Sequence, residues 1–86
     1  MTMPYDVIEV RQEDTRRLYL RFRDGVAGNL WFMPSFFRGV FTPLQNPEFF
    51  AQVNCSQGFV TWPGELDLAP DAMHDEIQRW GEWVLE

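Results

Sequence analysis

Two residues whose types could do nucleophilic or metal chemistry occur once each in the chain, Cys55 and His74. A thiol becomes a nucleophile when a nearby base or positive charge lowers its pKa, and we expect His74 on a different element from Cys55. A metal site needs three or four converging ligands, but the surroundings of His74 supply only carboxylates. We therefore predict a packed cysteine and a histidine on the surface of a helix.

Four carboxylates gather along the sequence, at Glu65, Asp67, Asp71 and Asp75. Paired carboxylates do acid–base work only where burial separates their pKa values, and the spacing of a calcium loop is absent. Because they flank an expected helix start, where each negative charge is stabilised by about 0.3–1 kcal/mol, we interpret them as helix-start residues. Phosphate-loop, serine-elbow and zinc patterns do not occur. We predict no catalytic residue, no metal, no cofactor, and a protein that is not an enzyme.

The length and composition of the chain limit the kind of fold that could position such residues. The 86 residues are 45% hydrophobic and 16% aromatic, which allows a single domain over residues 1–86 to bury a core without disulfides. A lone cysteine fits a reducing compartment, and the sequence has neither a signal-peptide pattern nor a long apolar run. We expect a soluble cytoplasmic protein with no membrane partner.

Charge is distributed unevenly along the chain, whose formal net charge is −6. Residues 1–40 carry six arginines and five acids, a net charge of +1, whereas residues 41–86 carry eight acids and one arginine, a net charge of −7. Such an acidic surface repels phosphate at long range and suits a basic partner, although it also serves solubility alone. Nucleic acid as the sole partner is disfavoured.

Alternating apolar residues predict an α+β fold with a small antiparallel sheet. We expect a β-hairpin over residues 18–32 and further strands near residues 5–10, 53–55 and 59–62. A three-residue hairpin loop over residues 23–25 pairs Phe22 with Val26 and Leu18 with Leu30, and it places Gly25 where positive φ is needed.

Two helices complete the predicted fold. A short helix over residues 47–52 begins after Asn46, which is a suitable N-cap, and a C-terminal helix spans residues 70–85. In the long helix, an apolar stripe runs through Met73, Ile77, Trp80 and Val84. The middle segment supplies a hydrophobic plug for the core, made of Phe41, Leu44, Phe49 and Phe50.

Four stretches carry a resemblance to a known family, in this order: Phe22-x-Asp24-Gly25, Gly39-Val40-Phe41-x-Pro43-Leu44-x-x-Pro47-x-x-Phe50, Val60-x-Trp62-Pro63 and Asp67-Leu68-x-Pro70-Asp71. The sequence between about Val7 and Met73 resembles the bacterial domain of unknown function 2442. The resemblance implies a small α+β domain, which some members fuse to a helix-turn-helix domain and others encode beside another small protein, as toxin–antitoxin pairs are. It supplies no catalytic residue.

Outward-facing side chains of the hairpin form one candidate binding surface, because arginine and aromatic residues together are typical of binding hot spots. The C-terminal helix or a second subunit could instead cover this face, and we expect the helix to do so. The acidic flank of that helix is the other candidate surface. The candidate partner-binding residues are Arg17, Tyr19, Arg21, Trp31, Asp75, Glu76, Arg79, Glu82 and Trp83.

Two functions of different classes follow. The first is a non-enzymatic protein-interaction or regulatory module, an antitoxin-like partner of a small basic protein, for which a homodimer is compatible. The alternative is a nucleic-acid-binding or autoregulatory module that acts through Arg16, Arg17, Arg21 and Arg23 together with Trp31.

Overall fold

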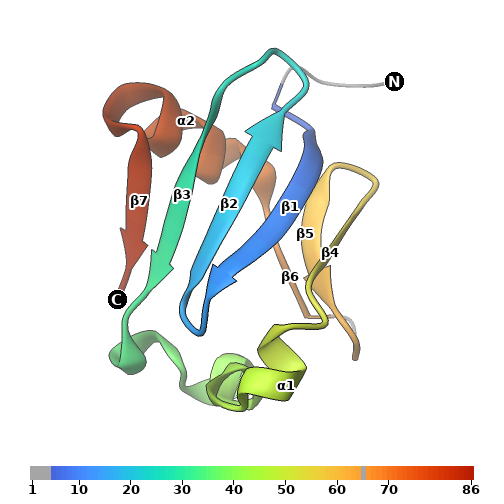
Figure 1. Ribbon diagram of the computed structural model, residues 1–86, viewed down its shortest axis with the longest axis vertical. Coiled ribbons are helices and arrows are strands. Elements are labelled where there is room, and N and C mark those ends of the chain that lie inside the picture. Colours follow the sequence, from blue (N-terminus) through green and yellow to red (C-terminus); the bar gives the residue numbers. More distant parts are fainter. Residues whose placement is uncertain (1–4, 65) are drawn as a thin grey trace.

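Two small sheets and two α-helices make up the structure, a computed structural model that describes residues 5–64 and 66–86 (Figure 1). The first sheet has the strand order β1-β2-β3-β7, formed by Val7–Asp14, Arg17–Phe22, Ala27–Phe32 and Glu82–Leu85. The second has the order β4-β5-β6, formed by Asn54–Ser56, Phe59–Trp62 and Leu66–Leu68. The predicted α+β class is confirmed. The role predicted for Glu65 lies outside the described residues.

The β2–β3 hairpin has the predicted register. Leu18 pairs with Leu30 and Arg17 with Trp31, and the backbone N–H of Phe22 donates to the carbonyl of Val26 at 2.8 Å. Gly25 has a φ of +94°, which an L side chain rarely adopts, and this closes the three-residue loop. The hairpin therefore fixes which side chains lie opposite one another on each face of the sheet.

The predicted helix over residues 70–85 is wrong over its last five residues. Helix α2 covers Pro70–Trp80 and ends at Gly81, whose φ of +81° and N–H bond to the carbonyl of Ile77 at 2.7 Å are those of a glycine cap. Glu82–Leu85 then forms β7, which pairs in parallel with β3. Met73 and Ile77 are buried as the stripe predicted, but Trp80 and Val84 are exposed.

Several other boundaries differ from those predicted. Strand β1 runs to Asp14 instead of ending near residue 10, and β6 was not predicted. Helix α1 covers only Pro47–Phe50, although Asn46 caps it as predicted and accepts the N–H of Glu48 at 2.9 Å. The predicted single antiparallel sheet is two sheets, because β4 and β5 pair with β6. The second sheet packs against β1, where the N–H of Val7 donates to the carbonyl of Gly58 at 3.0 Å.

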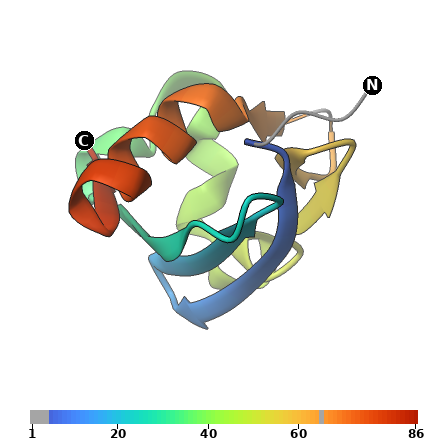
Figure 2. The same cartoon turned by 90° about the horizontal axis from the view of Figure 1, so that it is seen from above.

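The core lies between the inner face of the first sheet and α2, which runs along one side of that sheet (Figure 2). Phe32 is central, with ring centroids 5.3 Å from Phe50 and 6.2 Å from Trp62, and the indole N–H of Trp62 donates to the carbonyl of Phe50 at 3.0 Å. The predicted plug is confirmed: Leu44 and Phe50 are buried, and Phe41 and Phe49 are half-buried against them. The segment forms two 3-10 turns, η1 (Pro34–Phe36) and η2 (Gly39–Gln45), before α1.

Candidate functional site

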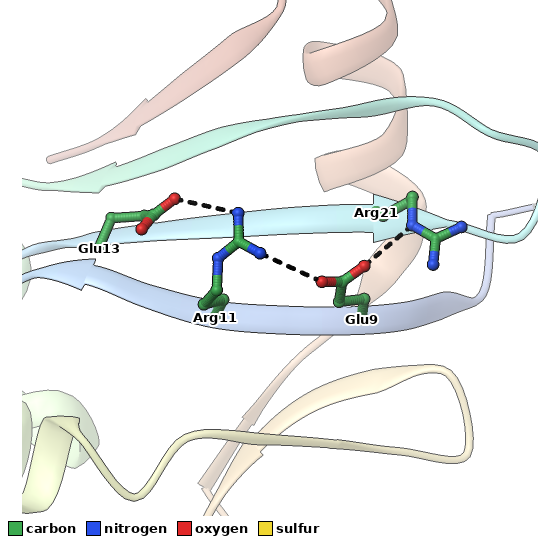
Figure 3. Close-up of polar contacts among 4 residues, drawn as sticks. All are labelled: Glu9, Arg11, Glu13 and Arg21. Carbon is green, nitrogen blue, oxygen red and sulfur yellow. Dashed lines mark hydrogen bonds and ion pairs between the residues drawn. The ribbon is translucent and has the colours of Figure 1, made fainter.

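The outer face of the first sheet, which we define as the side turned away from α2, carries the hairpin residues predicted to bind. Alternation along the strands sends Leu18 and Leu20 inward and Arg17, Tyr19 and Arg21 outward. Figure 3 shows side chains of this face with α2 behind the sheet. The expectation that the helix covers this face is therefore wrong, since α2 packs on the opposite side, where it contributes Met73 and Ile77 to the core.

One ion pair joins β1 to β2 on the outer face, and two more run along β1 (Figure 3). Glu9 accepts from Arg21 at 3.0 Å and from Arg11 at 3.5 Å, and Arg11 also reaches Glu13 at 3.3 Å. The guanidinium of Arg11 lies 4.7 Å from the ring centroid of Tyr19. The charged side chains of this network are between 33% and 56% exposed, so it sets the charge pattern of the face more than its stability.

A second group continues across β2, β3 and β7. The guanidinium of Arg17 stacks 4.9 Å from the ring centroid of Trp31, and the indole N–H of Trp31 donates to Glu82 Oε1 at 3.1 Å. Within the described residues, Arg17 Nε is buried without a hydrogen-bond partner, so stacking holds this arginine more than pairing does. Glu82 thus belongs to the outer face, and not to a helix flank as predicted.

The carboxylates of the outer face are at least as many as its arginines. Three arginines, Arg11, Arg17 and Arg21, lie among three glutamates, two on β1 and one on β7, and Asp14 pairs directly opposite Arg17. The remaining arginines of the nucleic-acid alternative, Arg16 and Arg23, lie beyond the two ends of β2, whose six residues separate them by roughly 20 Å. A phosphate backbone would therefore meet carboxylates beside the arginines instead of a continuous basic stripe.

The other predicted candidates do not form one cluster. Asp75 and Arg79 pair along α2 at 3.4 Å, with side chains 61% and 59% exposed, and Glu76 lies beside them half-buried. Trp83 is on β7, where its pairing with the inward-facing Leu30 directs it to the core side, and it packs half-buried against the core. The acidic flank and the Arg17–Trp31 group thus lie on opposite sides of the sheet.

Trp80 is an exposed residue that the sequence reasoning assigned to the core. Its side chain lies at the last position of α2 and is 69% exposed, and Val84 on the adjoining strand is 42% exposed. The signal that could have found it is Gly81, because a glycine directly after an apolar helical position is a common helix end. With Gly81 as the end, Trp80 no longer belongs to a continuing stripe.

His74 lies on α2 as predicted, but it is mostly buried and holds the helix to the β2–β3 loop instead of lying on an open helix surface. Its Nε2 lies 2.7 Å from Asp24 Oδ2, its ring meets Phe22 edge-on at 5.0 Å, and its side chain is only 14% exposed. The hydrogen bond from His74 is the main cause that lowers the pKa of Asp24 below its ordinary 3.8.

Cys55 is half-buried against the core, as predicted. Over residues 5–64 and 66–86, no three His, Cys, Asp or Glu side chains are grouped as metal ligands would be.

Comparison with known proteins gives a family. The model of the family described as protein of unknown function DUF2442 matches residues 7–79. No curated protein and no solved structure matches the chain. None of the helices in the described residues is long and apolar enough to cross a membrane. Because the family match covers most of the sequence, as the four stretches predicted, the chain belongs to the DUF2442 family.

Proposed function

We propose that this chain is a non-enzymatic protein-interaction module that binds a small basic protein, as an antitoxin binds its toxin. The observation that carries the proposal is Trp80, a tryptophan that is 69% exposed at the end of an otherwise well-packed helix. Tryptophan is enriched among the residues that contribute most to binding, and a large aromatic side chain left in water favours a partner that covers it.

The charges around Trp80 favour a basic partner. Residues 70–86 contain Asp71, Asp75, Glu76, Glu82 and Glu86 against Arg79 alone, a net charge of −4. Four of the five acids are exposed, and Glu76 is half-buried. Complementary charge raises the association rate and weakens with salt, so binding that depends on this segment should be salt-sensitive.

One hollow in the surface fits a non-enzymatic role. One of about 450 Å³ is lined by Thr15, Arg16, Pro34, Phe37, Leu44, Gln45 and Pro47, and Arg16 is the one ionisable side chain among them. This set offers neither a nucleophile beside a base nor a pair of carboxylates with separated pKa values. The half-buried free thiol of Cys55 fits a cytoplasmic location.

Affinity capture tests this function. The tagged chain is purified from cells that encode it, the column is eluted in salt steps from about 50 to about 500 mM, and the eluates are identified by mass spectrometry. We expect a small basic protein that elutes as salt rises and that a Trp80→Ala variant fails to retain. Val40→Ala is the matched control, because Val40 is 72% exposed on η2 and should retain the partner. Recovery of no protein, or equal recovery by Trp80→Ala, would overturn the proposal.

A further inference from the structure

Strand β7 is an edge of the first sheet, with β3 on one side of it and no strand of the described residues on the other. The carbonyl groups of Gly81 and Leu85 accept hydrogen bonds from Asn29 and Met33 at 3.3 and 2.8 Å, so these two residues turn their backbone groups toward β3. Backbone groups of alternate residues point to the same side of a strand. The N–H and C=O groups of Glu82 and Val84 therefore point to the open edge.

The open edge is protected only in part, by its length of four residues and by the charge of Glu82. Lysine, proline, a bulge or a covering loop blunt most exposed edges, but Glu82–Leu85 has neither lysine nor proline and pairs with β3 without a register shift. Val84, which supplies two of these backbone groups, has an exposed side chain, and the exposed Trp80 comes two residues before Glu82 in the sequence. Together they offer main-chain donors and acceptors beside apolar surface, which is the combination that an added strand uses.

We propose that this edge binds a strand of a basic partner protein, which extends the first sheet next to β7. The inference rests on the proposed function and names its binding mode. The negative charge beside this edge favours a different protein over a second copy of this chain. In a homodimer, each copy would bring the net charge of −4 from its residues 70–86 to the same edge. A partner strand with basic side chains opposite Glu82 and Glu86, and an apolar side chain opposite Val84, would match the outward-facing residues of this segment.

A designed peptide serves as the probe. Acetyl-Gly-Lys-Val-Ile-Val-Lys-Gly-amide places lysines against the two glutamates and isoleucine against Val84 when it pairs as an antiparallel strand. Its control is the same peptide N-methylated at the isoleucine, which removes the donor that would face Val84 and keeps every charge. Binding is measured by titrating the ¹⁵N-labelled chain and by amide hydrogen exchange.

Two variants of the chain test the backbone contact from the other side. Val84→Pro removes an N–H that points to the open edge, so the pairing with β3 can persist, as proline is tolerated on edge strands. Val84→Thr keeps that N–H and is the matched control. Dispersed amide spectra of both variants establish that each is folded. If Val84→Pro does not fold, the two peptides alone decide.

The expected result is that the peptide shifts and protects the amides of Glu82 and Val84. N-methylation and Val84→Pro should each weaken binding at least tenfold, whereas Val84→Thr should change it less than about twofold. Equal affinity for both peptides, or shifts confined to α2, would overturn the proposal. So would a dimer of the free chain in which these amides are already protected, because the edge would then belong to a second copy.

The outcome separates this inference from the proposed function. A captured basic protein that Trp80→Ala loses but Val84→Pro retains would leave the function standing and overturn the strand pairing. A chain that captures no protein, yet pairs with the peptide along β7, would overturn the function and support the edge.

Discussion

Substitution of Gly28 tests the placement of α2 and β7 on the sheet. A Cβ atom at this position of β3 would overlap the carbonyl oxygen of Gly81 and lie 2.7 Å from Ile77 Cγ2. Both neighbours are held in place. Ile77 is 2% exposed in the core, and the Gly81 carbonyl accepts the N–H of Asn29 at 3.3 Å. Gly28→Ala must therefore displace backbone, and not merely a flexible side chain.

The size of the effect follows from these two contacts. Overpacking of a core costs about 1–3 kcal/mol. Loss of the first hydrogen bond between β3 and β7 adds about 0.5–1.5 kcal/mol. The smaller unfolded-state entropy of alanine offsets about 0.4–1 kcal/mol. We expect the free energy of unfolding to fall by about 0.5–4 kcal/mol, which lowers Tm by roughly 2–32 °C in a domain of this size.

Thermal and urea unfolding followed by circular dichroism measure this change. The exposed Ala27, next to Gly28 on β3, provides the control Ala27→Ser, which should change the stability by less than about 0.5 kcal/mol. A Gly28→Ala protein as stable as the parent would refute the close crossing of α2, β7 and β3, and with it the position of the open edge.

Three further substitutions give sharp expectations. The lowered pKa of Asp24 means that its ionised form, bonded to His74, stabilises the fold above pH 3.8 and that this contribution disappears as pH falls through the lowered value. Asp24→Asn should therefore cost stability at about pH 5, and the difference from the parent in urea unfolding should shrink at about pH 3; a difference that grows with acidity would contradict it. Gln57 has a φ of +53°, a strained backbone conformation that asparagine adopts more readily. Gln57→Asn should therefore raise the free energy of unfolding by up to about 1 kcal/mol. A lower Tm for this variant would show that the backbone at Gln57 is not strained. Glu9→Gln breaks the exposed 3.0 Å pair with Arg21 and should change stability by less than about 1 kcal/mol in the same melts, whereas a larger loss would show that the outer-face network holds the sheet.

The hairpin was predictable in detail because its determinants are local. Leu18, Leu20 and Phe22 alternate without interruption, and Gly25 supplies the positive φ that a three-residue loop requires. The opposition of Arg17 and Trp31 follows from that register alone. The short helix after Asn46 was predictable for the same reason, since its cap lies directly beside it in the sequence.

The C-terminal part was not predictable from local pattern. Trp80 and Val84 continue the helical spacing of Met73 and Ile77, so periodicity alone favours one long helix. The helix ends because Gly81 caps it and because the next residues pair with the edge of β3, about fifty residues earlier in the chain. No window of sequence contains both, and tertiary pairing decided the structure of this segment.

The candidate site was missed where it depends on that pairing. Once β7 lies beside β3, Glu82 joins Trp31 on the outer face, Trp83 turns to the core and Trp80 is left exposed. Helical spacing alone groups Glu82 and Trp83 with the acidic side of a helix. The grouping of the residues at this end of the chain therefore could not be predicted from their spacing in the sequence.

Amide hydrogen exchange of the chain, alone and with its captured partner, tests the central claim most directly, because it reads the backbone groups at the open edge. We predict that protection of the amides of Glu82 and Val84 rises at least tenfold in the complex, while the buried strand β2 changes little. Unchanged exchange at these two amides, with new protection confined to the Arg17 and Trp31 face or to no segment, would contradict the account.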